Sequence, residues 1–311
     1  MASPSSTPPT AHIAPTSAYV AWVAVCVIWG TTYLAIRIAL ETIPPGLLGG
    51  MRFTAAGLVL AAFVRARGYR LPPRRDWPMQ AVIGLLMLGV GNGLVVVAEL
   101  WIPSGIAAVG VASAPFWMTG IESMAGGERL DLRTVAGFCI GFGGIVVLIW
   151  PDLFHGGARN LTFTAGIVFA QLACLGWSIG SSLSKRWTAR GNALGASAVQ
   201  QLCGGLVMLA VGTVAGEWHA VAFTGRSLAA ELYLIVFGSL GAYSAYVYAL
   251  QHLPTATVSL YAYINPVIAV ILGTLIAKEP FNPRVVIAAA MVLAGIAVVR
   301  GRTPLRLGNS K

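Results

Sequence analysis

Long apolar stretches alternate with short polar connections along almost the whole chain. A helix needs about 20 apolar residues to cross the roughly 30 Å hydrocarbon core of a bilayer. Ten stretches approach or exceed this length, and the short connections predict that neighbours in sequence are neighbours in space. The pattern predicts an all-α membrane protein whose helices cover residues 19–40, 46–64, 78–100, 104–125, 134–150, 163–185, 195–216, 229–250, 256–277 and 284–300.

The positions of lysine and arginine predict the orientation of these helices. Short cytoplasmic loops of membrane proteins hold an excess of Lys and Arg. Most of the chain's 20 such residues follow the second, fourth, sixth and tenth predicted helices, which places both termini in the cytoplasm. Residues 1–18 are rich in Pro, Ser and Thr and lack the basic start of a signal peptide. They are predicted to form a disordered tail, and residues 302–311 a cytoplasmic C-terminal tail.

One segment of the chain occurs twice. The run PSGIAAVGVASAPFWMTGIESMAGGE, residues 103–128, returns 151 positions later as PTATVSLYAYINPVIAVILGTLIAKE, residues 254–279. Residues 19–150 and 163–301 are therefore predicted to be two copies of a five-helix unit. Because five is odd, the second copy must be upside down, which gives two inverted five-helix repeats. The aligned residues include Pro103 with Pro254, Ser104 with Thr255, Pro115 with Pro266 and Glu128 with Glu279.

Each copy of this segment has a proline near its middle. Proline has no N–H to donate and crowds the carbonyl one turn earlier, so Pro115 and Pro266 are predicted to break their helices and to free the carbonyls of Val111 and Ala262. In lipid, a freed carbonyl must find a protein group, a water or a ligand. Inverted repeats with interrupted helices near the midplane are typical of alternating-access carriers.

Composition supports a membrane protein and excludes several other classes. Hydrophobic residues make up 57% of the chain and charged residues 10%, against roughly 25% charged in soluble domains. The lipid bilayer is therefore an expected partner. The net charge of +10 lies between apolar stretches rather than on one amphipathic face, so no nucleic-acid partner is expected.

Cysteine, histidine and glycine give no sign of a metal or cofactor. The four cysteines fall in four different apolar stretches, and the four histidines lie outside these stretches or at their ends, with no ligand spacing. The glycine run at residues 89–93 has no strand before it, so it indicates close helix packing rather than a nucleotide loop. No metal site and no cofactor are expected.

Several short motifs occur in a fixed order. They are Trp29-Gly30-Thr31 with Tyr33, Met51-Arg52-Phe53, PSGIAAV before Pro115, Tyr263-Ile264-Asn265-Pro266 and Glu279, with glycine-rich fifth and tenth helices. Over about residues 19–301 the chain resembles the EamA-type drug/metabolite transporters, and residues 91–109 are most similar to the YedA-like inner-membrane branch. The resemblance implies a ten-helix bacterial inner-membrane carrier that exports small metabolites, often amino acids or related compounds, through a central cavity.

A cavity between the repeats is predicted to be lined by polar and aromatic side chains. Trp29 and Tyr33 are one turn apart on one helix face, as are Tyr261 and Asn265. Such residues can bind a solute, or they can fill helix interfaces and satisfy one another. The predicted lining residues are Trp29, Tyr33, Asn92, Trp117, Trp177, Ser181, Gln200, Tyr243, Tyr246, Tyr261 and Asn265.

Three charged residues stand within or next to the apolar stretches. Arg52 is the predicted contact for a substrate carboxylate, through two-point hydrogen bonding. The alternative is a structural ion pair or a side chain that extends to the membrane surface. Glu99 and Glu122 are the acids most embedded in apolar sequence, and a desolvated carboxylate can carry a coupling proton. The competing interpretation is that each pairs with a nearby arginine.

The sequence thus predicts a secondary transporter that exports a small-molecule substrate by alternating access, as a monomer or homodimer. One alternative is a translocase for a lipid or lipid-linked intermediate, whose cavity would open sideways between helices. Another is a non-transporting membrane scaffold. An intramembrane enzyme is not expected, because the predicted helices lack Ser/His pairs, His clusters and Asp-rich metal motifs.

Overall fold

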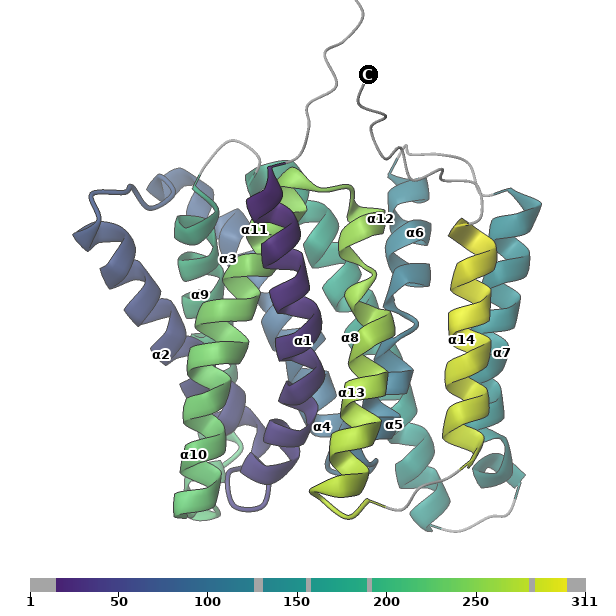
Figure 1. Cartoon of the computed structure of the whole chain (residues 1–311). Helices are drawn as coiled ribbons and strands as arrows, with labels where there is room; N and C mark the ends of the chain where they lie inside the picture. The colour runs from purple at the N-terminus through teal and green to yellow at the C-terminus, as the bar shows by residue number, and fades with distance from the viewer. Residues whose placement is uncertain (1–14, 126–130, 155–157, 189–191, 280–282, 301–311) are drawn as a thin grey trace, which may run out of the picture.

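The described residues of the computed structural model, 15–125, 131–154, 158–188, 192–279 and 283–300, form helices and turns with no strand among them (Figure 1). All ten predicted segments are helical. Six are single helices: α1 (Thr16–Ala39), α2 (Pro45–Ala66), α7 (Leu132–Phe154), α8 (Ala158–Thr188), α9 (Ala193–Val214) and, as the tenth segment, α14 (Pro283–Arg300).

The other four segments are divided. The third consists of α3 (Trp77–Gly84), η2 (Leu85–Asn92) and α4 (Gly93–Ala98), and the fourth of α5 (Ser104–Val111) and α6 (Ala114–Met124). The eighth consists of α10 (Gly225–Tyr233), η4 (Leu234–Tyr243) and α11 (Ser244–His252), and the ninth of α12 (Thr255–Val258) and α13 (Tyr261–Leu275). Two single 3₁₀ turns, η1 (Arg74–Asp76) and η3 (Glu217–His219), lie in connections.

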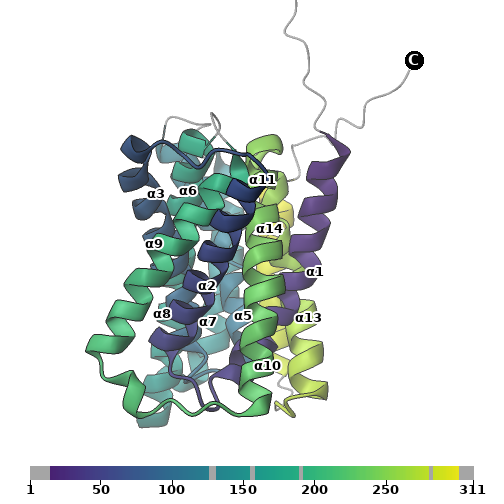
Figure 2. The ribbon, with the colours of Figure 1, turned by 90° about the vertical axis from the view of Figure 1, so that its left-hand side faces the viewer.

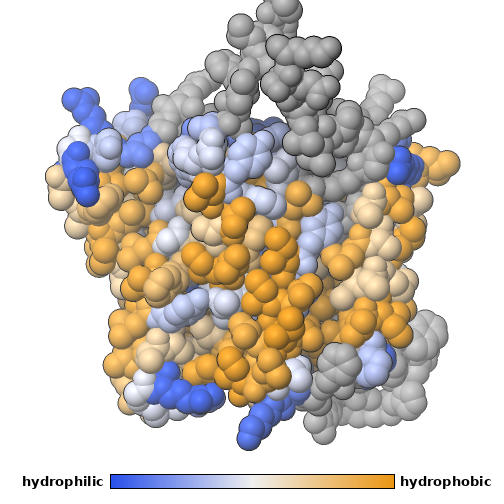
Figure 3. All heavy atoms as spheres, in the orientation of Figure 1, coloured by the Kyte–Doolittle hydropathy of each residue, from blue (hydrophilic) through white to orange (hydrophobic). Residues whose placement is uncertain are grey.

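These lengths suit a membrane. Among the described residues, seven helical spans are long and apolar enough to cross a bilayer, and three further apolar helices are shorter. Apolar side chains cover the middle of the face shown in Figure 3, and strongly polar ones gather at its upper and lower edges. One boundary differs from the prediction: Thr16–Ala18, assigned to the N-terminal tail, already belong to α1.

The two halves of the chain run in opposite directions. α1 begins and α14 ends on one face of the bundle, here called the terminal face, at the top of Figures 1 and 2. α5 and α6 run from the opposite face to the terminal face, whereas α12 and α13 run from the terminal face to the opposite face (Figure 1). The fourth and ninth segments are therefore antiparallel, as inverted repeats require.

Equivalent helices of the two repeats pack against each other. α2, the second helix of the first repeat, lies along α9, the second helix of the other, and α7 lies along α14 in the same way. Glycines permit this approach: a Cβ added to Gly50 would lie 2.6 Å from Leu209 Cα, and one added to Gly295 would lie 2.4 Å from the Gly137 carbonyl oxygen. Small residues at helix interfaces are a common means of association in lipid.

The third and eighth segments each contain a π-helix, which the sequence did not predict. η2 ends at Asn92 and η4 at Tyr243, which are separated by the same 151 positions as the duplicated prolines. A π-helix widens the turn by one residue and occurs frequently at functional sites. The duplication thus extends to a shared backbone irregularity.

The two helix breaks are not equivalent. The first agrees with the prediction, because α5 ends at Val111 and α6 begins at Ala114, with Pro115 in its first turn. The second break lies at Ser259 and Leu260, so Pro266 is inside α13 rather than at a break. Neighbouring groups sustain a proline within a membrane helix. The Asn265 amide, next to this proline, donates to the carbonyls of Tyr261 (3.1 Å) and, across to α1, Cys26 (3.0 Å), once it is oriented with its nitrogen toward them.

Candidate functional site

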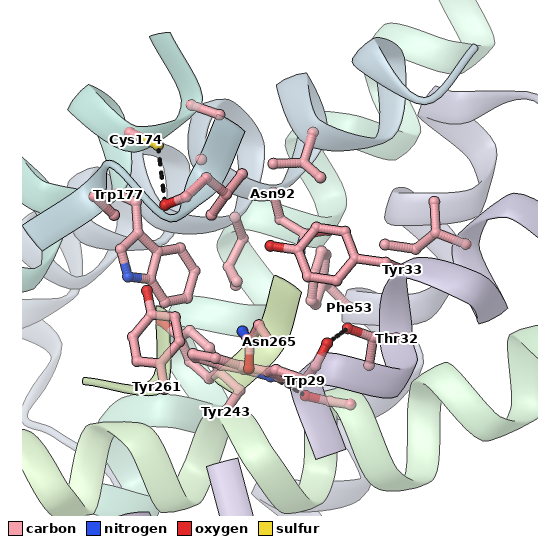
Figure 4. Close-up of a pocket in the computed structure, with 18 of the residues that line it drawn as sticks. Trp29, Thr32, Tyr33, Phe53, Asn92, Cys174, Trp177, Tyr243, Tyr261 and Asn265 are labelled. Atoms are coloured by element: carbon pink, nitrogen blue, oxygen red, sulfur yellow. Dashed lines mark hydrogen bonds between the residues drawn. The ribbon is translucent and has the colours of Figure 1, made fainter. Parts of the chain in front are cut away.

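A cavity of about 60 Å³ lies between the two repeats (Figure 4). A buried water needs roughly 10–15 Å³ of such volume, so this cavity holds a few waters and no metabolite. It draws on α1, α2, η2, α4, α5, α6, α8, η4 and α13. The site must widen before a solute can enter.

Seven of the predicted lining residues, and the predicted substrate contact Arg52, lie at this cavity. Figure 4 shows Tyr33 and Trp177 on opposite sides of the space, with Asn265 and Tyr261 along one edge. Thr32, Phe53 and Cys174 line it as well and were not predicted. The seven are Trp29, Tyr33, Asn92, Trp177, Tyr243, Tyr261 and Asn265.

Aromatic rings form one wall of the cavity. Trp29 meets Trp177 and Tyr261 edge to face, with ring centroids 5.2 and 5.1 Å apart, and its indole N–H donates to the Gly238 carbonyl at 3.3 Å. Edge-to-face pairs contribute about 0.5–1.5 kcal/mol beyond burial. The wall is therefore a mutually braced cluster that joins α1, α8 and α13.

Arg52 supplies a positive charge to the cavity and is 2% exposed. Its Nε donates to Ser239 Oγ at 2.7 Å, and its guanidinium lies 4.6 Å from the Phe53 ring centroid. Nη1 is buried without a hydrogen-bond partner among the described residues. A buried guanidinium nitrogen without an acceptor is energetically costly, so it favours binding of a hydrogen-bond acceptor there, most strongly a carboxylate.

An acid that the sequence analysis missed acts on Arg52. Glu231 on α10 is 4% exposed and acts electrostatically on Arg52, but the two do not form an ion pair. Both carboxylate oxygens of Glu231 lack a partner in the described structure. The sequence did show an acid within the apolar eighth segment. Glu231 was not selected because it lies close to the start of that segment.

Asn92 supplies a bare acceptor to the same cavity. It is the last residue of the π-helix η2, and its Oδ1 is buried without a partner among the described residues. Tyr243, at the end of η4, is different, because its hydroxyl donates to Gln200 Oε1 at 2.7 Å. Two residues that line the cavity thus carry a buried polar atom without a partner among the described residues, a donor on Arg52 and an acceptor on Asn92.

Four residues predicted to line the cavity lie behind its wall. The Tyr246 hydroxyl bonds Trp177 Nε1 (3.1 Å) and Ser181 Oγ (2.8 Å). Gln200 Nε2 donates to Gln80 Oε1 at 2.7 Å, and Trp117 Nε1 donates to Gln171 Oε1 at 3.1 Å. Their polar groups satisfy one another, so the structure supports the alternative of helix-to-helix bonding for Trp117, Ser181, Gln200 and Tyr246.

The two acids proposed for proton coupling lie in contrasting surroundings. Glu122, at the terminal face, accepts from Ser182 Oγ at 3.0 Å and lies 3.6 Å from Arg186, with 36% of its side chain exposed. This matches the ion-pair interpretation. Glu99 is fully buried, and neither of its carboxylate oxygens has a partner in the part of the chain that the structure describes. Arg37 donates to the main-chain carbonyl of Glu99 instead.

The break between α5 and α6 is held by a glutamine that the sequence analysis did not select. Gln171 Nε2 donates to the Gly110 carbonyl at 3.0 Å, and its Oε1 accepts from Ser113 Oγ at 2.8 Å. The Val111 carbonyl, predicted to be free, receives the Cys174 thiol at 3.7 Å. A lone glutamine in the middle of an apolar stretch was the signal for this role.

Replacing Gln171 by leucine is expected to destabilise the protein by about 1–3 kcal/mol, because the Trp117 N–H loses its acceptor and the Gly110 carbonyl keeps its bonds from Ser113 but loses the one from Gln171. The free energy of unfolding in detergent, measured by denaturant titration, checks this. Equal stability of Gln171→Leu and the wild type would contradict the bracing role.

A larger cavity of about 480 Å³ opens at the opposite face. Its charged lining comprises Arg37, Glu41, Arg226 and Lys278, and Arg226 pairs with Glu41 at 3.1 Å. Positive charge is in excess there, and a cleft with an excess of one sign concentrates solutes of the other. This face is therefore electrostatically favourable to anions.

Two antiparallel five-helix repeats around a small central cavity are an architecture typical of membrane carriers. The sequence profile of the EamA-like transporter family matches residues 16–150 and 164–301, one match for each repeat. The chain belongs to the EamA-like transporter family. The resemblance noted from the motifs and the architecture of two inverted five-helix repeats are thereby confirmed.

Individual relatives are consistent with this membership. The chain is 36% identical over 277 residues to the uncharacterized inner membrane transporter YedA of Escherichia coli K12, covering 89% of this chain and 88% of that protein. It is 25% identical over 277 residues to a probable terminal-alkyne amino-acid exporter of Streptantibioticus cattleyicolor, covering 89% and 91%. A solved crystal structure with 24% identity matches at a TM-score of 0.65 over 91% of this chain and 96% of that one, which shows a shared fold.

Proposed function

We propose that this transporter exports a small amphipathic metabolite, an amino acid or a related compound, across the bacterial inner membrane by alternating access. The observation that carries the proposal is the pair of unsatisfied groups in one cavity, Arg52 Nη1 and Asn92 Oδ1. A carboxylate satisfies the first and an ammonium the second. An α-amino acid carries both, and the aromatic wall suits an apolar side chain.

Two further features support the location of the protein and its orientation in the membrane. The name of the YedA relative places that protein in the inner membrane, and the excess of Lys and Arg on the terminal face predicts that this face is cytoplasmic. The cavity is too small for a metabolite as it stands, so binding and release require the helices around it to separate. Glu99, buried and without a partner, is the candidate for proton coupling. Its role is tested by whether flux responds to a collapsed pH gradient.

The direct test is counterflow in proteoliposomes that contain the purified full-length protein. Vesicles loaded with one unlabelled amino acid at a time are assayed for uptake of the same labelled compound, and the panel spans aromatic, aliphatic, acidic and basic side chains. Accumulation of at least one compound above empty vesicles supports the proposal. Failure of the whole panel, with scrambling of a fluorescent phospholipid instead, would favour the lipid translocase.

Replacing Asn92 by leucine, which has a similar volume, is expected to weaken binding of the transported amino acid by about tenfold, because a hydrogen bond to a charged group is lost. The deaminated acid with the same side chain has no ammonium, so its binding is expected to change little. Competition of both compounds against counterflow measures this. Equal weakening of the two would mean that Asn92 acts through packing and not on the ammonium.

A further inference from the structure

Glu279 ties the two repeats together at the opposite face. Its Oε1 accepts from the main-chain N–H and the hydroxyl of Ser104, at 2.9 and 2.8 Å, and its Oε2 accepts from the N–H of Gly105 at 3.3 Å. These donors form the start of α5, in the first repeat, whereas Glu279 follows α13 in the second. One carboxylate therefore joins the starting end of one broken segment to the finishing end of the other.

The backbone is shaped to make this contact. Lys278 is the one described non-glycine residue with a positive φ, 53°, and the Glu279 N–H donates back to the Gly273 carbonyl at 3.1 Å. A left-handed conformation costs a non-glycine residue about 1 kcal/mol or more. It folds Glu279 back over the end of α13, where a Cβ added to Gly273 would lie 2.5 Å from Glu279 Oε2 and 3.1 Å from Ser104 Oγ.

The related position at the terminal face makes a different contact. Thr255 corresponds to Ser104 in the duplication, and its hydroxyl accepts from Lys185 Nζ of α8 at 2.7 Å. Glu122, near the end of α6, likewise contacts Ser182 and Arg186 of α8. The start of α5 is thus held by a carboxylate of the other broken segment, whereas the start of α12 is held by a lysine within α8. Glu128, the counterpart of Glu279 in sequence, lies outside the described residues.

We propose that the Glu279 carboxylate is a latch that closes the opposite face of the carrier and must release Ser104 and Gly105 before the cavity opens there. The inference rests on the alternating-access cycle and the orientation proposed above. A carrier built from inverted repeats exchanges the environments of its two faces as it cycles. The contacts that differ between the two faces are those that must break and form. Glu279 is a positioning residue in this scheme, since it acts through α5 and does not line the cavity.

The Cys174 thiol, which lies at the cavity, can be used to measure how often each face opens, even when the substrate is unknown. In a chain whose Cys26, Cys139 and Cys203 are replaced by alanine, Cys174 remains as the single thiol facing the cavity. A membrane-impermeant sulfonated maleimide is added to spheroplasts, where it reaches the outer surface, or to inverted vesicles, where it reaches the cytoplasmic surface. The rates of Cys174 labelling from the two sides measure how often each face opens.

Glu279→Gln is expected to raise labelling from outside by about tenfold, because the charge-assisted bonds to Ser104 and Gly105 are lost, and to lower labelling from inside or leave it unchanged. Ser104→Ala, which loses one of the three bonds, is expected to give a rise of the same sign and smaller size, about threefold. If thermal unfolding in detergent shows that Glu279→Gln does not fold, the labelling rates of Ser104→Ala test the latch instead.

The chain contains a matched control. Glu217 also places its carboxylate on the start of a helix at the same face, accepting from the N–H groups of Gly46 (3.2 Å) and Leu47 (2.8 Å) of α2. Glu217→Gln removes a similar helix-end contact and is expected to leave labelling from outside as in the wild type. The latch is refuted if the Glu279 and Glu217 variants behave alike, or if Glu279→Gln raises labelling equally from both sides. Absence of counterflow in the wild type counts against the proposed function and leaves the latch result standing.

Discussion

Replacing Arg52 by glutamine is expected to lower the affinity for the transported amino acid by about 100-fold, because a carboxylate paired with a buried guanidinium loses roughly 2–5 kcal/mol when the charge is removed. Arg52 is 2% exposed, lines the cavity and keeps one N–H group free of any described partner. Among the residues that the structure describes, no other Lys or Arg lines that cavity. These residues therefore supply no second cation to replace Arg52.

The measurement is concentration-dependent counterflow in proteoliposomes, with Arg52→Lys and Arg52→Gln beside the wild type. Lysine preserves the charge without the planar fork, so an intermediate loss is expected for Arg52→Lys. The decarboxylated amine of the same compound separates recognition from folding: its weak binding is expected to be no weaker in Arg52→Gln than in the wild type. A variant that loses the acid and the amine equally would assign Arg52 to structure, most directly through Glu231, whose buried charge would then lack its counter-charge.

Much of the fold follows from two features of the sequence. Apolar length predicted the ten helical segments, and the repeat of Pro103–Glu128 at Pro254–Glu279 predicted that the halves are inverted. Both features can be recognised in the sequence. The thickness of the bilayer sets the length of the apolar stretches, and the odd number of helices in each unit requires the second copy to be inverted. The packing of α2 on α9 and of α7 on α14 follows from the same symmetry.

The finer backbone did not follow from the sequence. The π-helices η2 and η4 contain the same apolar residues as an α-helix and no proline, so one added residue in a turn leaves no pattern to detect. The second break was assigned to Pro266 because a proline removes a hydrogen bond, but it occurs at Ser259 and Leu260. Packing against α1, where a Cβ on Gly30 would lie 2.8 Å from Ile268, supports the helix that continues through Pro266.

The site residues divide along a similar line. Helical spacing correctly places Tyr33 with Trp29, and Asn265 with Tyr261, on faces that reach the cavity. Spacing within one helix cannot tell which neighbouring helix supplies a partner. Tyr246 meets Ser181 and Trp177 across α11 and α8, so it braces the wall from behind. Gln171, which bonds both Gly110 and Trp117, has its role only through that three-dimensional arrangement.

Substituting alanine for Gly84 is expected to disrupt the packing of α3 and η2 on α9, with the largest loss of stability among the changes considered. A Cβ on Gly84 would lie 2.2 Å from the Gln200 carbonyl oxygen and 2.9 Å from its carbon. These atoms are backbone, so α9 or the segment of α3 and η2 must shift, and overpacking of this kind costs about 1–3 kcal/mol or more. Gly204, one turn further along α9, is also in close contact with Gly84, because a Cβ added to it would lie 2.7 Å from the Gly84 carbonyl oxygen.

Gly89→Ala is the matched comparison, because it adds the same methyl group to the same predicted segment, five residues further along. Its Cβ would approach only the end of the flexible Leu85 side chain, at 2.9 Å, which can turn away. Thermal unfolding and size-exclusion profiles in detergent are expected to show a marked loss for Gly84→Ala and little change for Gly89→Ala. Because η2 carries Asn92 at its end and α9 carries Gln200, which accepts from Tyr243, any folded Gly84→Ala protein should also show a weakened site. Wild-type stability in that variant would mean that α9 and η2 are less closely packed in the membrane than the glycine contacts indicate.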